Sequence, residues 1–201
     1  DPVAEPRHLF LDVPGRRETT AFISLSWQFS NNSSLRAEYD GRDDRARLVY
    51  QTLHGQGVGS YNAYGEVSRS PTDAAFNGSF NYIANRAELG LSHFTAFDGP
   101  DNGRTSLRVG TSLGFADGAV SVGRPIYDSF AIVEGHKSLK GADVTVNPTP
   151  FGYTANTGAL GTALETNLSA YAERTITVDA PNAPAGYDLG SGSFRMFPPY
   201  R

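Results

Sequence analysis

The chain contains no cysteine among its 201 residues. Disulfide scaffolds, thiolate metal sites and cysteine nucleophiles are therefore excluded. It also lacks any run of about 18 apolar residues, which excludes a transmembrane helix but not a transmembrane strand, since a strand crosses with about 10 residues. The net charge of −4 lacks the basic surplus of a general nucleic-acid binder, so we expect no nucleic-acid partner.

Residues that could carry catalysis are also scarce. The four histidines have none of the spacings that bind zinc. Asp43 and Asp44 fall in a predicted turn, and Glu38 with Asp40 is better explained as part of a charge ladder between strands. The arginines of that ladder are Arg36, Arg45, Arg47, Arg86, Arg104 and Arg108. We therefore expect no enzyme activity, no metal or cofactor and no small-molecule substrate.

What the chain does contain is a period-two pattern of side chains. In residues 18–29, Ile23, Leu25 and Trp27 alternate with small polar residues, which predicts a long strand. Turn sequences such as Asp117-Gly118 separate the alternating runs. The same alternation recurs in residues 35–40, 45–51, 60–68, 74–82, 86–92, 104–116 and 119–122. Residues 18–124 are thus predicted to form an all-β, antiparallel up-and-down meander of about eight strands.

This alternation fits two environments. In a soluble sheet the apolar face packs on a second sheet, and in an outer-membrane barrel it meets lipid while the polar face lines a lumen. Three features favour a segment of a large transmembrane β-barrel: strands long enough to cross, aromatic residues near strand ends, and polar faces rich in Gly, Ser, Asn and paired charge. The alternative is a soluble secreted β-sandwich, either an adhesin or a carbohydrate-binding module.

The barrel interpretation assigns each strand face to an environment. The residues expected to face lipid are Ile23, Leu25, Trp27, Leu107, Val109 and Leu113. The residues expected to face the lumen are Arg36, Glu38, Arg104 and Arg108.

The composition changes at Pro125. Seven of the 12 prolines lie from this residue onward, among short strand-like runs at 128–133 and 175–179. Residues 125–201 are therefore predicted to form a small β-sandwich-like domain. No linker separates it from residues 1–124, so we expect the two parts to be rigidly joined.

One segment resembles a known family. Residues 123–133 read Gly-Arg-Pro-Ile-Tyr-Asp-Ser-Phe-Ala-Ile-Val. This is similar to the segment in fimbrial outer-membrane usher proteins that follows the last barrel strand and opens the first C-terminal periplasmic domain. Two weaker similarities support it: residues 81–90 resemble hairpins of usher barrels, and residues 168–171 with 186–192 resemble a return of the C-terminal domain in one usher branch.

The resemblance implies a function in the chaperone–usher pathway. Ushers are outer-membrane platforms that assemble and secrete pilus subunits, and they need no nucleotide or metal. The chain would be a fragment, with residues 1–124 as part of the barrel and residues after about 125 in the periplasm. Its partners would be periplasmic chaperone–pilin complexes and outer-membrane lipid. With eight strands, the Asp117-Gly118 turn would lie on the outer side of the membrane.

Overall fold

The computed structural model describes residues 20–97, 103–139, 141–186 and 192–200. Within these ranges the protein is all-β apart from two short 3-10 helices, η1 (Lys137–Leu139) and η2 (Gly158–Leu160). The predicted fold class is confirmed. The first two residues of the predicted strand 18–29, and most of the 186–192 segment, lie outside the described residues.

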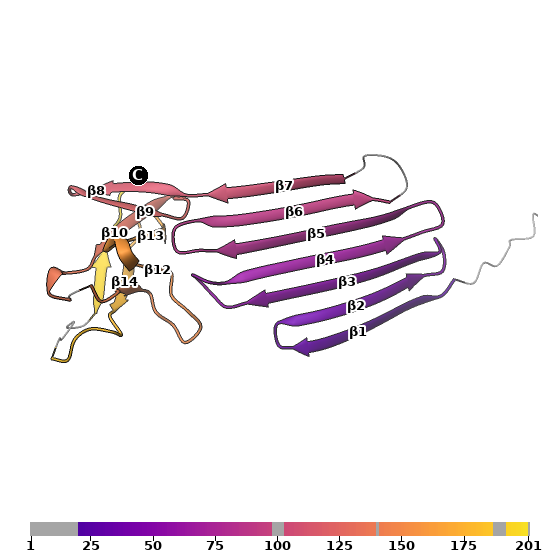
Figure 1. The fold of residues 1–201 in the computed structure, drawn as a ribbon, viewed down its shortest axis with the longest axis horizontal. Coiled ribbons are helices and arrows are strands. Elements are labelled where there is room, and N and C mark those ends of the chain that lie inside the picture. Colours follow the sequence, from indigo (N-terminus) through magenta and orange to yellow (C-terminus); the bar gives the residue numbers. More distant parts are fainter. Residues whose placement is uncertain (1–19, 98–102, 140, 187–191, 201) are drawn as a thin grey trace, which may run out of the picture.

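The first part of the protein is one antiparallel sheet in which each strand pairs with the next along the chain (Figure 1). The predicted up-and-down meander is therefore confirmed. Its strands are β1 (Phe22–Ser30), β2 (Ser33–Asp40), β3 (Arg45–His54), β4 (Tyr61–Arg69), β5 (Ala74–Ile83), β6 (Glu88–Ala96) and β7 (Gly103–Gly110). Among the described residues, β1 and β7 are the two edges of the sheet.

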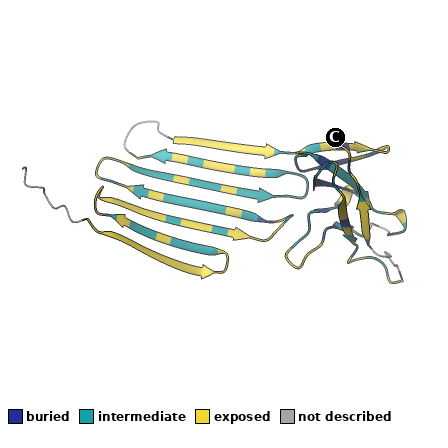
Figure 2. Ribbon diagram, turned by 180° about the vertical axis from the view of Figure 1, so that it is seen from behind, coloured by how far each residue is buried: buried dark blue, intermediate teal, exposed yellow. Residues whose placement is uncertain are grey.

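This sheet is a single layer. No residue of β1 to β7 is buried, so both faces are at least partly open along every strand (Figure 2). The buried residues instead gather in the C-terminal part of the protein. A soluble sheet normally covers its apolar face with a second layer, and here the described residues supply none.

The sheet has seven strands where the sequence predicts about eight. The strand expected at 104–116 divides at Thr111 into β7 and β8 (Ser112–Ala116), and β8 pairs with β9 (Ala119–Gly123) in a separate two-stranded sheet. At the break, the Thr111 hydroxyl donates to the carbonyl oxygen of Arg86, 2.9 Å away. The β8–β9 hairpin therefore leaves the meander and lies beside the following strands.

Residues 111–200, here called the C-terminal unit, contain three layers. The middle layer pairs β10 (Ser129–Glu134) with β13 (Thr162–Leu168), and one outer layer is the β8–β9 hairpin. A Cβ atom at Gly123 would lie only 2.6 Å from Cβ of Leu164, so the hairpin approaches β13 closely. The other outer layer is formed by β12 (Ala155–Asn156), β11 (Thr145–Val146), β14 (Arg174–Asp179) and β15 (Ser193–Met196).

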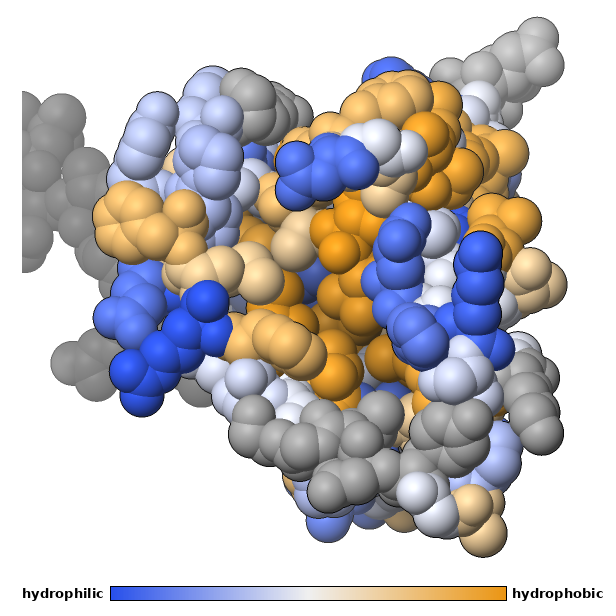
Figure 3. Space-filling model, turned by 90° about the vertical axis from the view of Figure 1, so that its left-hand side faces the viewer, coloured by the Kyte–Doolittle hydropathy of each residue, from blue (hydrophilic) through white to orange (hydrophobic). Residues whose placement is uncertain are grey.

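The core of the C-terminal unit lies between the middle layer and the four-stranded sheet. Its buried members are Val146, Ala155, Ala163, Leu168 and Ile176. On the surface of the end of the molecule that this unit forms, hydrophobic side chains extend from the centre to the upper right of the view, with hydrophilic ones at the left (Figure 3).

Because successive strands run in opposite directions and β7 is the seventh, β7 ends at the same end of the sheet as β1, β3 and β5. The C-terminal unit therefore lies at the end that also carries the β1–β2, β3–β4 and β5–β6 turns (Figure 1). The Asp117-Gly118 turn belongs to the β8–β9 hairpin and lies at this same end. The expectation that it lies at the opposite end is wrong, because it counted residues 104–116 and 119–122 as consecutive strands of the meander.

Candidate functional site

The pairing register sorts the side chains of the large sheet onto two faces. Residues directly opposite one another in an antiparallel pair share a face, so Trp27, Leu35 and Tyr50 lie on one side. Following the register across all seven strands identifies the residues that share this side of the sheet, here called the apolar face. Its larger members are Ile23, Leu25, Trp27, Leu35, Tyr39, Leu48, Tyr50, Val67, Phe76, Phe80, Leu89, Leu91, Leu107 and Val109.

Five of the six residues expected to face lipid lie on this apolar face. Those five are Ile23, Leu25, Trp27, Leu107 and Val109. The sixth, Leu113, is in β8, outside the large sheet. The apolar face is open: Leu107 is 72% exposed and Leu25 is 53% exposed. Contact of these residues with lipid stays a prediction.

Aromatic side chains gather on the apolar face near the end that carries the C-terminal unit. The ring of His54 stacks on Tyr61 at a centroid distance of 5.1 Å, and Tyr61 lies 5.9 Å from Phe80. Tyr82 is directly opposite Tyr61 in the register. Aromatic residues in such a band are typical of a membrane–water interface.

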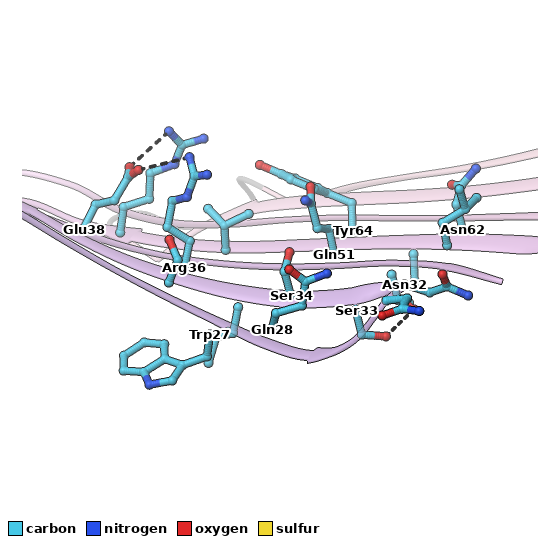
Figure 4. Close-up of a pocket in the computed structure, with 18 residues that line it drawn as sticks. Trp27, Gln28, Asn32, Ser33, Ser34, Arg36, Glu38, Gln51, Asn62 and Tyr64 are labelled. Atoms are coloured by element: carbon cyan, nitrogen blue, oxygen red, sulfur yellow. Dashed lines mark hydrogen bonds and ion pairs between the residues drawn. The ribbon is translucent and has the colours of Figure 1, made fainter.

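The four residues expected to face a lumen all lie on the other, polar face. Glu38 is opposite Arg47, and Arg108 is opposite Gly90. Arg36 lies two residues from Glu38 on β2, and Arg104 lies four residues from Arg108 on β7, so each pair points to the same face. Figure 4 shows Trp27 on the opposite side of the ribbon from Arg36 and the other polar side chains.

Ion pairs join the polar face across β2, β3 and β4. Arg36 lies 3.7 Å from Glu38, Arg47 lies 3.8 Å from Glu38, and Arg47 donates to Glu66 at 2.8 Å. The hydroxyl of Tyr64 also donates to Glu66. Glu66 and Tyr64 were not among the candidate residues. In the register Arg47 lies opposite Ser68, and Glu66 lies two residues from Ser68 on the same face of β4. Arg47 and Glu66 are therefore diagonal neighbours on the polar face.

Arg104 and Arg108 are not part of this network. They lie on β7, at the far side of the sheet, and neither forms an ion pair with another described residue. Gly90, opposite Arg108, leaves room for Asn81, because a Cβ atom at position 90 would come within 3.1 Å of Asn81 Oδ1. The structure thus places the four candidate residues on one face without bringing them into one cluster.

A shallow hollow lies on the polar face of the large sheet (Figure 4). Its lining is mostly amide, hydroxyl and charged groups from β1 to β4, including Gln28, Ser34, Gln51 and Asn62. No group of three His, Asp or Glu side chains within the described ranges could hold a metal ion. This surface therefore offers many hydrogen-bonding groups to whatever lies against it.

The turn between β5 and β6 joins the sheet to the C-terminal unit. The guanidinium of Arg86 donates to three carbonyl oxygens: those of Val122 at 2.8 Å, Thr157 at 2.7 Å and Thr162 at 3.1 Å. At a second contact, the backbone N–H of Val58 donates to the carbonyl oxygen of Tyr153 at 2.8 Å. Arg86 was expected in the charge ladder, and this expectation is wrong because its side chain points into the joint.

No helix in the described parts of the chain is long and apolar enough to cross a membrane. The chain matches no protein-family model, and a search of the curated proteins also finds no match.

Proposed function

We propose that this chain is a segment of an outer-membrane usher, which assembles and secretes pilus subunits delivered by a periplasmic chaperone. The large sheet would form part of the transmembrane barrel, and the C-terminal unit would lie in the periplasm. The proposal involves no catalysis and no cofactor. It rests chiefly on one observation, the uncovered apolar face of a single-layer sheet.

An uncovered apolar face of this size is unfavourable in water. Burying apolar surface contributes roughly 25 cal/mol per Å², and soluble monomers rarely expose contiguous apolar patches larger than a few hundred Å². Here every strand from β1 to β7 carries at least one exposed large apolar residue on this face, from Ile23 on β1 to Leu107 on β7. A lipid bilayer removes this cost, provided that the edges β1 and β7 pair with further strands to close a barrel.

The polar face suits the wall of a secretion channel. Over β2 to β4, Arg36, Glu38, Arg47 and Glu66 are joined in ion pairs, so positive and negative groups of this part of the wall lie beside one another. Amide and hydroxyl groups such as Gln51 and Asn62 hydrogen-bond to water as well as to protein. Folded subunits could slide along such a hydrated surface without adhering to it.

The segment that resembles ushers has a structural role within the C-terminal unit. Arg124 donates to the carbonyl oxygen of Thr154 at 2.9 Å, and Asp128 accepts from the backbone N–H of Ala170 at 3.0 Å. Ser129 donates to the carbonyl oxygen of Pro199 at 2.8 Å. The resemblance therefore falls on side chains that hold the C-terminal unit together, which supports the proposal.

Accessibility of paired cysteines tests the membrane part of the proposal. Val67 and Ser68 are neighbours on β4 that lie on opposite faces, and the chain has no cysteine of its own. We expect a water-soluble thiol reagent to modify the variant Ser68→Cys, and a lipid-soluble reagent to modify Val67→Cys, in the full protein in its membrane. Equal modification of both by the water-soluble reagent would contradict a membrane-facing sheet and favour a soluble β-sandwich.

The usher part of the proposal needs its own measurement. We expect the full protein to co-purify with periplasmic chaperone–pilin complexes, and surface pili to disappear when its gene is deleted. If the cysteine pattern holds but pili are unchanged in the deletion strain, the protein is an outer-membrane pore unrelated to pili.

A further inference from the structure

The β8–β9 hairpin is held in one orientation by its inner face. A Cβ atom at Gly114 would lie 2.6 Å from Leu164 Cδ1 and 3.0 Å from Phe130 Cε2, so any larger residue would require these side chains to shift. Ser121 on β9 also lies on this face and is 2% exposed. Because the inner face fits the β10–β13 layer so closely, the hairpin has a defined outer face.

The outer face of the hairpin is apolar and uncovered. Leu113 is 58% exposed, Phe115 is 67% exposed and Val120 is 50% exposed. Phe115 is directly opposite Val120 in the register, so the two share this face. None of the residues on this face carries a charge, and Asp117 lies at the tip of the hairpin, in the turn.

This outer face continues the apolar face of the large sheet. A Cβ atom at Gly110 would lie 2.7 Å from Pro125 Cγ, and one at Gly114 would lie 2.6 Å from Leu164 Cδ1. These two even-numbered positions therefore face the C-terminal unit on both sides of the break at Thr111. On the other side, Val109 is 60% exposed and Leu113 is 58% exposed, while the Thr111 hydroxyl between them donates to the carbonyl oxygens of Arg86 and Gly123 at the break. The two apolar surfaces therefore lie on one side of the protein.

We propose that the outer face of the β8–β9 hairpin contacts phospholipid at the inner leaflet of the outer membrane and so anchors the C-terminal unit against the bilayer. This inference rests on the proposed membrane location of the large sheet. Leu113 follows Val109 by four residues, which is about 13 Å along a strand at roughly 3.3 Å per residue. In a tilted strand this places Leu113 and Phe115 at the level of the lipid headgroups, where aromatic and aliphatic side chains partition well.

The turn geometry fits this placement. Asp117 and Gly118 both have positive φ, 50° and 82°, as in the tight turns that match the twist of two-residue hairpins. The Asp117 carboxylate at the tip stays in water while the apolar strands lie along the membrane surface. The hairpin would thus fix how close the C-terminal unit lies to the bilayer.

Site-specific fluorescence quenching by lipid tests this inference. Single-cysteine variants Phe115→Cys, Leu107→Cys and Arg195→Cys would be labelled with an environment-sensitive fluorophore in the full protein. The protein would be reconstituted in vesicles of phosphatidylethanolamine and phosphatidylglycerol that carry nitroxide-labelled lipid. Leu107 represents the apolar sheet face, and Arg195, on β15, represents a water-exposed position of the same C-terminal unit.

We expect quenching of the labels at positions 115 and 107, and none at position 195. Quenching at 107 without quenching at 115 would overturn the inference while leaving the membrane sheet intact. Absence of quenching at both 107 and 115 would overturn the proposed function as well. Equal quenching at 115 and 195 would mean that the unit meets the membrane without a specific contact through the hairpin. All three side chains are exposed, so their replacement is expected to leave the fold unchanged.

Discussion

Asn85 and Asn156 are joined by three hydrogen bonds although 71 residues separate them in the sequence. The Asn85 amide nitrogen donates to the backbone oxygen of Asn156 at 2.9 Å and to its side-chain oxygen at 2.6 Å, while the Asn156 backbone N–H donates to Asn85 Oδ1 at 2.9 Å. This relationship fixes the β5–β6 turn to strand β12. Together with Arg86, it makes the junction between the sheet and the C-terminal unit specific rather than a simple chain connection.

Loss of the Arg86 guanidinium should loosen this junction. In Arg86→Ala three carbonyl oxygens lose their donor. Hydrogen bonds to charged groups are worth about 1.5–3 kcal/mol each. We therefore expect the free energy of unfolding to fall by at least about 2 kcal/mol. Limited proteolysis between residues 111 and 125 and thermal unfolding of the C-terminal unit would measure it. Arg42→Ala, in a turn at the other end of the sheet, is the matched control. Equal behaviour of the two variants would show that Arg86 does not hold the joint.

The close approach of β9 to β13 should depend on glycine at position 123. In Gly123→Ala the new Cβ would meet Leu164 Cβ at 2.6 Å, so we expect the overpacking cost of about 1–3 kcal/mol. Gly65→Ala is the control, because a Cβ there meets nothing within 4 Å. Chemical denaturation of the two variants gives the comparison. A stability loss no greater than that of Gly65→Ala would mean that the hairpin does not pack on Leu164.

A charge on the apolar face should block membrane assembly if the sheet crosses a bilayer. Leu107→Arg places a guanidinium on this face and should cost about 2–4 kcal/mol near the midplane. Ser106→Arg is one residue away on the polar face and should be tolerated. The amount of folded full protein in the outer membrane provides the measurement. Normal assembly of Leu107→Arg would show that this face does not contact lipid.

The ion pairs of the polar face should contribute little to stability. Arg47 has a side chain that is 42% exposed, and pairs open to water are worth up to about 1 kcal/mol. We therefore expect Glu66→Gln to change the free energy of unfolding by less than about 1 kcal/mol, and by less still at high salt. A loss of several kcal/mol would indicate that this face is packed against another protein layer and is not a hydrated wall.

Much of the large sheet could be predicted from the sequence because strand alternation is a local property. Ile23, Leu25 and Trp27 occupy every second position, and successive side chains of a strand point to opposite faces, so the three share one face. Arg36 and Glu38 follow from the same rule on the neighbouring strand. The ion pair of Arg47 with Glu66 was not predicted, because it depends on the register between β3 and β4, which alternation alone leaves open.

The sequence by itself determined the all-β class, the meander and the composition of its two faces, since each follows from residue periodicity and turn chemistry along a short stretch of chain. Only the tertiary structure decided where the meander stops. Residues 104–116 alternate without interruption, and β8 leaves the sheet because Gly114 and Gly123 fit against Leu164, a residue distant in sequence. The role of Arg86 was decided in the same way, because its three carbonyl partners come together only when the C-terminal unit folds against the β5–β6 turn.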